Sequence, residues 1–467
     1  MNPFLNPITS IPFLKNFLFD PSRLKRYSPV KIKAHQDSAL RKIITYSYTV
    51  PLYQKKFKEA KIHPNDIRGM QDYAKLPFIT KQHLVDHFPD EIVPRDYNKG
   101  KAQIVSTGGS TGKPVSIYTD FSVLSGGIGA SIRTLQNLQL NWRTSRIVQI
   151  GNYSTGKADI AAESVLYSKA RSLSLLNNFI YMNAFDPIKD IINAVDEFKP
   201  DMILSYPATF QHLAFLKNKG YGKNINPTAL VASASVLDQY TRDYVEDAFR
   251  CKIYNVYGST ESSSEAAIAF ECSEGIWHVN HDYHYVQAVD ENLEVVGDGE
   301  RGHIVETRLF GKATPIVKYL GLDDWVSIIS DYSCSCGLRT PIFKHGVEGR
   351  ISGSVTLPDG RVFPAASFVS IHDALKKLNT KKVKQYQIVQ RKLNEIDILL
   401  VIDEELRNSG PSLEQVFKEI KEIHQKKAGP AVTIKVKEVN NIKSDPGKPA
   451  SLVISHVQPK KGHILVD

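Results

Sequence analysis

The chain has 467 residues, of which 42% are hydrophobic and 23% are charged. These values are typical of a globular protein and exclude a disordered or fibrous chain. Lys and Arg outnumber Asp and Glu by 59 to 49, giving a formal net charge of +10. Such a charge favours anionic ligands, either a nucleotide or a nucleic acid. Because no basic run is interleaved with aromatic residues, we expect no nucleic-acid partner.

Four cysteines in so long a chain exclude a secreted disulfide framework. The uncharged apolar runs are of strand length and fall short of the ~20 residues that a membrane span needs. Within residues 1–20, three prolines and Lys15 interrupt the apolar side chains, which makes a poor signal-peptide core. We therefore expect a cytoplasmic protein with no transmembrane segment. Peripheral contact of residues 1–20 with a membrane remains open.

The chain begins with a helical segment and continues as an α/β domain. Residues 22–97 are predicted to be helical, because Leu40, Ile43 and Ile44 recur at helical spacing and prolines punctuate the stretch. Between about residues 103 and 309, short apolar runs alternate with amphipathic stretches; the runs include 147–151, 203–207 and 228–235. This alternation predicts an α/β domain built around buried strands.

The character of the sequence changes after Gly349. A turn-rich piece leads to a predicted helix over 367–378, followed by two strands, a charged helix over 412–427 and a further strand. This order predicts a small α+β domain. The expected division is an N-terminal domain over 1–348, a hinge over 349–353 and a C-terminal domain over 354–467.

The most informative motif is STGGSTGKP, residues 106–114. Its glycines let backbone N–H groups approach an anion, its hydroxyl groups donate hydrogen bonds, and Lys113 adds positive charge, so it suits a phosphate-binding loop. It is not a Walker A loop, because Thr107 stands where the first glycine is required and Pro114 follows the lysine. A plain surface loop is the competing interpretation.

Two further motifs are weak when each is taken alone. NVYGSTES, residues 255–262, ends an apolar run in a turn where a carboxylate and hydroxyl groups could meet a metal-bound nucleotide. SDPGKPASLV, residues 444–453, carries Lys448 between two prolines.

Together and in this order, the three motifs resemble the adenylate-forming enzymes, and more narrowly the phenylacetate–coenzyme A ligase family with its relatives from polysaccharide-synthesis loci. Residues 49–67, 76–81, 299–309, 314–324 and 337–351 extend the resemblance nearly from end to end. It implies a large N-terminal adenylate-forming domain of mixed sheets and helices and a small mobile C-terminal α+β domain.

The resemblance also implies site residues. Lys448, Lys113 and Glu261 would be catalytic, with Glu261 holding Mg²⁺. Residues binding ATP would be Ser106, Thr107, Gly108, Gly109, Ser110, Thr111, Gly112, Lys113, Ser235, Tyr257, Gly258, Ser259, Thr260, Asp323 and Arg350; Asp324 is an alternative to Asp323. The sequence departs from the family pattern at Ser233–Ser235, Lys318–Leu320 and Ser352–Gly353.

The implied activity is ATP-dependent activation of a carboxylic acid. An acyl-adenylate forms with release of pyrophosphate, and coenzyme A is the expected acceptor; the family default is an aryl acid. Charge repulsion between the carboxylate and the α-phosphate requires positioned positive charge, which Mg²⁺ and the two lysines would supply. Two alternatives remain: an amide ligase acylating an amine of a sugar or amino acid, and a non-catalytic nucleotide-binding protein. Dimers are common in the family, so a homodimer is allowed.

The cysteines form a separate candidate site. Cys272, His278, Cys334 and Cys336 make a Cys₃His set suited to structural Zn²⁺, and His281 or His284 could replace His278. The spacing C-x₅-H…C-x-C is not a common zinc signature and by itself favours reduced, buried thiols. Relatives in the family carry similar Cys-rich turns, so both interpretations stay open.

Overall fold

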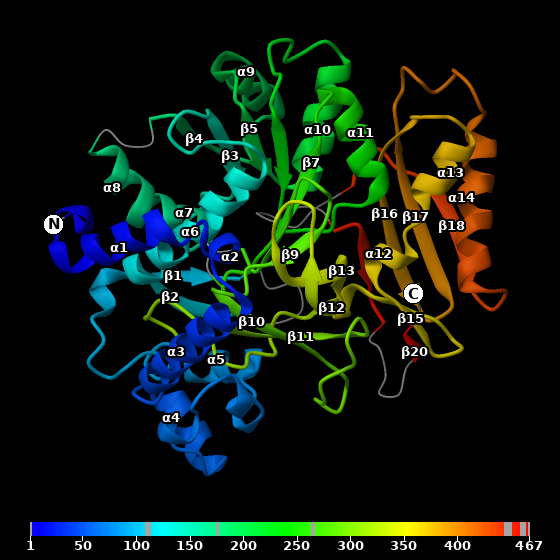
Figure 1. Cartoon of the computed structure of the whole chain (residues 1–467). Coiled ribbons are helices and arrows are strands. Elements are labelled where there is room, and N and C mark those ends of the chain that lie inside the picture. Colours follow the sequence, from blue (N-terminus) through cyan, green and yellow to red (C-terminus); the bar gives the residue numbers. More distant parts are fainter. Residues whose placement is uncertain are drawn as a thin grey trace. The chain divides into compact units, whose positions relative to one another are not determined.

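The computed structural model of the chain describes residues 2–107, 114–173, 177–262, 267–442, 451–457 and 464–465 (Figure 1). The chain forms two compact units. Unit one comprises Met1–Asn183, Tyr254–Leu322 and Val326–Gly346, and unit two comprises Ala184–Ile253, Asp323–Trp325 and Val347–Asp467. The predicted boundaries at 348 and 353 are not tested by this division and stay predictions.

The start of unit one is helical, as predicted for residues 22–97. Its helices are α1 (Pro7–Phe19), α2 (Arg23–Arg26), α3 (Pro29–Ser47), α4 (Pro51–Glu59) and α5 (Lys81–His87), joined by short 3₁₀ turns. The hydroxyl group of Ser28 accepts from the N–H of Lys31 and caps α3. One face of α3 buries Leu40, Ile43 and Ile44, which is the spacing that the sequence predicted.

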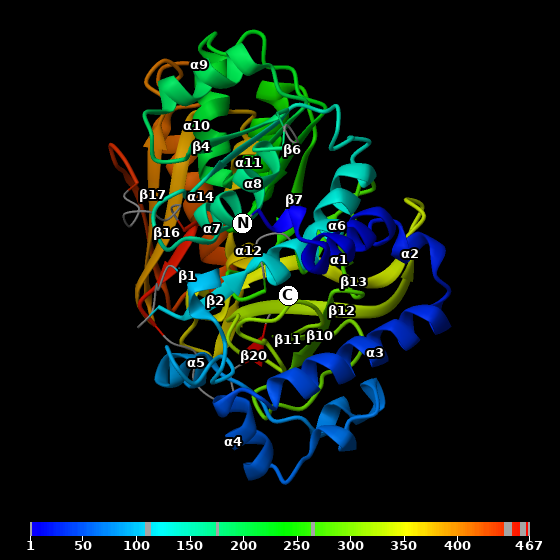
Figure 2. The same cartoon turned by 90° about the vertical axis from the view of Figure 1, so that its left-hand side faces the viewer.

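The remaining helices of unit one are α6 (Phe121–Asn137), α7 (Ala158–Ala162) and α8 (Ser168–Arg171), the last two joined by a π-helical turn. Helix α1 lies beside α6 in both views (Figures 1 and 2). In the described part of the chain, no helix combines the length and the apolar character that crossing a bilayer requires.

Three groups of strands lie wholly or mainly in unit one. Strands β1 (Ala102–Ser106) and β2 (Ser116–Asp120) are antiparallel, and β3 (Ile147–Gly151) and β4 (Phe179–Asn183) are parallel. The third group is β10 (His284–Val289), β11 (Arg301–Arg308), β12 (Asp324–Ser333), β13 (Arg339–Arg350), β9 (Trp277–Val279), β8 (Ala269–Glu271) and β7 (Ile253–Tyr257), hydrogen-bonded in this order. The tight turns between these strands carry the candidate site residues of unit one.

Unit two begins with parallel strands β5 (Met202–Ser205) and β6 (Ala229–Ala232) and the helices α9 (Ile188–Phe198), α10 (Pro207–Asn218) and α11 (Gln239–Phe249). Its later part contains the hairpin β14 (Val355–Thr356) and β15 (Arg361–Phe363), with β20 (Ile464–Leu465) parallel to β15. The buried strands predicted at 147–151, 203–207 and 228–235 are present as β3, β5 and β6.

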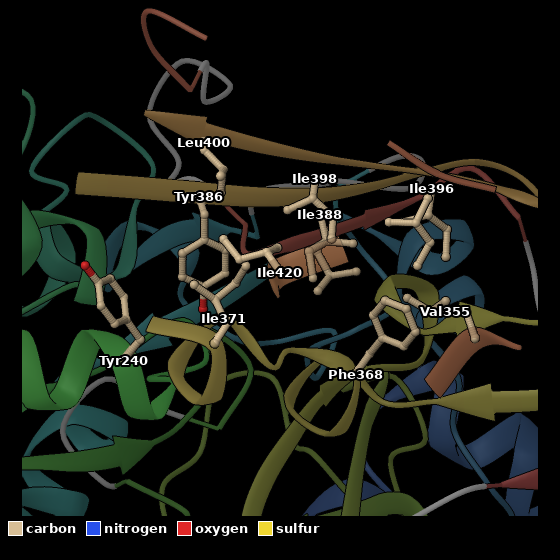
Figure 3. Close-up of a cluster of buried hydrophobic side chains, with 14 of the residues drawn as sticks. Tyr240, Val355, Phe368, Ile371, Tyr386, Ile388, Ile396, Ile398, Leu400 and Ile420 are labelled. Atoms are coloured by element: carbon tan, nitrogen blue, oxygen red, sulfur yellow. The ribbon is translucent and has the colours of Figure 1, made fainter. Parts of the chain in front are cut away.

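A four-stranded sheet forms the end of unit two, in the order β18 (Thr433–Glu438), β17 (Glu395–Ile402), β16 (Val383–Lys392) and β19 (Val453–Ser455). Strands β16 and β17 are antiparallel and the outer strands pair in parallel. Helix α14 (Leu413–Ala428) supplies the predicted charged helix, and the reciprocal hydrogen bonds between Ser412 and Gln415 cap it. Figure 3 shows the apolar side chains of this sheet meeting those of the helices.

The predicted helix over 367–378 is wrong in one respect. The structure has two helices there, α12 (Ala365–Phe368) and α13 (Ile371–Lys377). Val369 between them is extended, and the N–H of Ser370 donates to the ring of His424 on α14 instead of to a helical carbonyl. The break therefore arises from a contact with a distant part of the chain.

Candidate functional site

The strands β1 and β2 hold the base of the predicted phosphate loop. The N–H of Thr107 donates to the carbonyl of Val115 at 2.9 Å, and the N–H of Val115 donates to the Thr107 hydroxyl at 3.0 Å. The hydroxyl groups of Ser106 and Ser116 lie 2.7 Å apart across the two strands. Gly108 to Lys113 lie outside the described residues. The hairpin thus fixes both ends of the loop, and the roles of its residues stay predictions.

The second motif follows β7 directly. Tyr257 ends the strand, with its ring centroid 6.1 Å from that of Phe343. Gly258, Ser259 and Thr260 form the turn that follows, and the hydroxyl of Ser259 accepts from the N–H of Ser262 at 3.1 Å. This bond tightens the turn around Glu261.

Glu261 is a buried carboxylate, with 4% of the residue exposed. The hydroxyl of Tyr319 donates to its Oε1 at 2.9 Å, and Nη1 of Arg308 donates to its backbone carbonyl at 2.9 Å. Burial raises the pKa of Glu261, and the hydrogen bonds from Tyr319 and Ser259 oppose that rise. No basic side chain forms an ion pair with Glu261 in the described part of the chain. A buried carboxylate without a basic partner is suited to a cation.

A second buried carboxylate, Glu306, was not predicted from the sequence. Glu306 of β11 accepts from the hydroxyl of Ser262 and from Nδ1 of His284, both at 2.7 Å. The Glu306 and His284 side chains are fully buried. The signal available was a glutamate inside the apolar stretch HIVETRL, since charged residues are rarely buried unless they are paired. Glu306 anchors Ser262, the residue after Glu261.

Unit two contains the predicted ribose-binding residues. The hydroxyl of Ser352 donates to Oδ2 of Asp323 at 2.6 Å, and the N–H of Ile351 donates to the Asp323 carbonyl at 2.9 Å. Arg350 is the last residue of β13 and directly precedes Ile351, whose N–H bonds to Asp323. The structure therefore brings the backbones of Asp323 and Arg350 close together. Ser352, a departure from the family pattern, therefore serves to orient Asp323. Ser235 lies in the turn after β6.

Lys448, the predicted catalytic lysine, lies outside the described residues, as does Lys113. Their roles rest on the sequence motifs and remain predictions.

The four residues of the predicted zinc set come together. One ligand atom from each of Cys272, His278, Cys334 and Cys336 lies within 4.8 Å of all the others. The Sγ atoms of Cys272 and Cys334 are 3.9 Å apart, and Sγ of Cys336 is 3.4 Å from Nε2 of His278. Zn–S bonds of about 2.3 Å and Zn–N bonds of about 2.0 Å in a tetrahedron would give edges of roughly 3.8 and 3.5 Å. The two measured separations therefore have the size of edges in a tetrahedral zinc site.

Turns in the backbone present these side chains. Cys272 follows β8, and Cys334 and Cys336 lie between β12 and β13; each turn closes with a glycine N–H donating to the carbonyl of the first cysteine. Those glycines, Gly275 and Gly337, have φ of 76° and 85°, which favours glycine. Nδ1 of His278 lies 2.7 Å from the hydroxyl of Thr340, which orients the ring.

The thiols of Cys272 and Cys336 shift each other's pKa in opposite directions. The hydrogen bond from Cys336 lowers the pKa of Cys272, and the same contact raises the pKa of Cys336. His284 is hydrogen-bonded to Glu306, and Nδ1 of His281 faces the carbonyl of Val279. Neither histidine is therefore part of the Cys₃His set.

The sequence of this chain is similar to those of known proteins. Residues 365–456 match the family model of the CapK C-terminal domain. The chain is 25% identical over 378 residues to a phenylacetate–coenzyme A ligase of Thermus thermophilus, covering 79% of this chain and 80% of the relative. It is also 22% identical to protein CapK of Staphylococcus aureus, covering 85% of this chain and 84% of that protein.

Solved structures match the fold of the chain. A 2-hydroxyisobutyryl-CoA ligase in its postadenylation state superimposes with a TM-score of 0.75 and 19% identity, covering 93% of this chain and 91% of that one. The predicted α/β fold class and the predicted resemblance are thereby confirmed. The chain has the fold of the adenylate-forming CoA ligases, has phenylacetate–coenzyme A ligases and CapK among its homologues, and matches the CapK C-terminal domain over residues 365–456.

Proposed function

We propose that this chain is an ATP-dependent ligase that activates a carboxylic acid as an acyl-adenylate and transfers the acyl group to coenzyme A. The observation that carries the proposal is the Glu261 carboxylate, which is buried in the turn after β7 and held by the hydroxyl of Tyr319. The phenylacetate–coenzyme A ligases among the homologues support the same activity.

The first half-reaction joins two anions. An oxygen of the substrate carboxylate attacks the α-phosphorus of ATP, the bond to the bridging oxygen breaks, and pyrophosphate leaves. The chain lowers this barrier by placing positive charge and N–H donors around the phosphates. We assign that work to the loop from Ser106 to Lys113 and to Lys448, and we assign the binding of the ribose to Asp323 and Arg350. Tyr257 and Ser235 would line the adenine.

Glu261 fits a Mg²⁺ ion that accompanies ATP. Its carboxylate is buried and forms no ion pair within the described ranges, and carboxylate oxygens are preferred ligands of Mg²⁺. Bound there, the ion would neutralise charge on the phosphates. Tyr319 fixes the direction of the carboxylate, and Ser262 and Glu306 fix the turn that carries it.

In the second half-reaction, the thiol sulfur of coenzyme A attacks the acyl carbon and AMP leaves. An aryl acid is the first substrate class to test, because phenylacetate is the acid named for the homologues. An amine acceptor would give an amide from the same adenylate and is a second outcome of the assay.

The test is pyrophosphate release from ATP and Mg²⁺ with a panel of aryl and aliphatic acids, using hydroxylamine to trap the acyl-adenylate. Release that depends on one class of acid supports the ligase. Adding coenzyme A or amines and identifying the products by mass spectrometry then assigns the acceptor. ATP binding without pyrophosphate release for any acid would favour the non-catalytic nucleotide-binding protein, and no ATP binding at all would refute the proposal.

We also propose that Cys272, His278, Cys334 and Cys336 hold a structural Zn²⁺. The support is the fit between their spacing and a four-coordinate zinc site, together with the bond that orients His278. Four protein ligands would leave no open position for a substrate, so the ion would act on folding. Purified protein should contain one zinc per chain, and Cys336→Ser should lose it and melt at a lower temperature. Cys251→Ser is the control. Metal-free protein of unchanged melting temperature would contradict this assignment.

A further inference from the structure

One face of helix α1 packs against the rest of unit one. Phe13 and Phe17 lie four residues apart and share that face. The ring of Phe13 packs edge-on against Phe4, with centroids 4.9 Å apart, and the ring of Phe17 packs against Trp142 at 4.6 Å. Phe121 of α6 packs against both Phe4 and Phe13. The helix is therefore a fixed part of the fold.

The opposite face of α1 is also apolar, but it is exposed. Ile8, Ile11 and Leu18 recur at helical spacing and are 82%, 66% and 54% exposed. Leu5, Leu14 and Phe19 are also more than half exposed. A helix that is apolar all round is normally buried all round, and a contiguous exposed apolar patch marks an interaction site. We call these six side chains the α1 surface.

The α1 surface is bordered by cations. Residues 2–19 contain Lys15 and no acidic residue. Arg26 lies over the ring of Phe19, 5.8 Å from its centroid. Lys25 beside Arg26 is exposed. The next carboxylate along the chain, Asp20, is buried and pairs with Arg23.

We propose that the α1 surface binds an anionic lipid bilayer. Its aliphatic side chains would enter the boundary between headgroups and acyl chains, while Lys15, Lys25 and Arg26 contact lipid phosphates. A bilayer suits the surface better than a second copy of the chain, because a two-fold contact through the same patch would bring two cationic borders together. The helix would lie on the membrane without crossing it.

Co-sedimentation of the full chain with vesicles tests this proposal. We expect binding to vesicles of mixed phosphatidylglycerol and phosphatidylcholine, weaker binding at high salt, and little binding to phosphatidylcholine alone. The triple variant Ile8→Gln, Ile11→Gln and Leu18→Gln should lose at least about tenfold in partitioning, because each side chain gives up its apolar burial in the membrane. Lys25→Gln with Arg26→Gln should lose about fivefold per cation.

The matched control replaces apolar residues that are exposed elsewhere, namely Leu293, Val295 and Leu393, with Gln. It should bind vesicles like the unmodified chain, and both triple variants should keep the melting temperature, since the side chains replaced are exposed. Absence of vesicle binding, or binding that the α1 variant leaves unchanged, overturns the proposal. So does a dimer in light scattering that the α1 variant dissociates while vesicles bind neither form, because the occupant would then be a second copy.

Discussion

The hydroxyl of Tyr319 is the donor that holds the Glu261 carboxylate. Tyr319→Phe removes this bond and keeps the ring. Because a hydrogen bond to a charged group contributes about 1.5–3 kcal/mol, kcat/KM for pyrophosphate release should fall roughly 10- to 100-fold, and half-maximal rate should need more Mg²⁺. Tyr285→Phe, whose hydroxyl accepts a longer bond of 3.4 Å from Gln287, is the control. An unchanged Mg²⁺ requirement in Y319F would remove Tyr319 and Glu261 from the proposed site.

The lowered pKa of His424 lets us predict how the stability of unit two depends on pH. Its Nε2 faces the N–H of Ser370 at 3.3 Å and its Nδ1 faces the carbonyl of Ile420 at 2.7 Å, an arrangement that only the neutral ring satisfies. Burial lowers the pKa of His424 to about 4. The folded state therefore disfavours the proton that the unfolded chain binds below about pH 6.5.

The stabilising effect of the neutral His424 is complete above that unfolded pKa and is lost as the pH falls toward the folded one. The loss should approach roughly 3 kcal/mol in the free energy of unfolding. Urea unfolding at several pH values measures it. His424→Gln should remove this part of the pH dependence, whereas replacing the partly exposed His372 should keep it. A pH dependence unaltered in H424Q would show that other groups cause it.

At the scale of elements, every second side chain of β17 is apolar and buried, and this burial stabilises unit two. Ile396, Ile398 and Leu400 point to one side of the strand and are fully buried in the cluster of Figure 3. Ile398→Ala should lower the free energy of unfolding by about 2–5 kcal/mol through lost burial and a residual cavity. Leu393→Ala, at an exposed turn next to β17, should cost less than about 0.5 kcal/mol. Equal effects of the two changes on urea unfolding would contradict this account of the core.

For the whole molecule, we predict that one residue, Lys448, acts on acyl-adenylate formation and not on the binding of ATP. We expect Lys448→Ala to slow acyl-adenylate formation by about 10²–10³ while sparing ATP binding, because a lysine that meets developing charge acts mainly in the transition state. Pyrophosphate release and nucleotide affinity measure the two effects. Lys443→Ala, five residues earlier, is the control variant. Normal pyrophosphate release in K448A would reject the assignment of the catalytic lysine.

The secondary structure was predictable where local signals agree. The apolar runs that became β3, β5 and β6 are short and continuous, and the helix over 412–427 has a serine cap and a charged face. The break between α12 and α13 was not predictable, because the N–H of Ser370 bonds to His424, 54 residues later in the chain. Local periodicity carries no information about such a partner.

Some residues of the candidate site could likewise be predicted from the sequence, and others could not. Tyr257 to Glu261 and the cysteine turns were identifiable because their residue types have characteristic chemistry at short spacing. The burial of Glu306 had a signal in the sequence, but its partner Ser262 did not, and neither did the contact of Tyr319 with Glu261. Both contacts join residues more than 40 positions apart in the chain. The sequence could propose four zinc ligands but could not choose between a site and separate thiols.

By itself, the sequence determined the family resemblance and the α/β class, and it supplied the residues that we propose for the chemistry, since these depend on composition, periodicity and short motifs. Only the tertiary structure decided which of those residues meet: it joined Glu261 to Tyr319, closed the Cys₃His set, and left one face of α1 exposed. The physical reason is that burial, ion pairing and hydrogen bonding between distant segments depend on how the elements pack, and no local pattern in the chain encodes that packing.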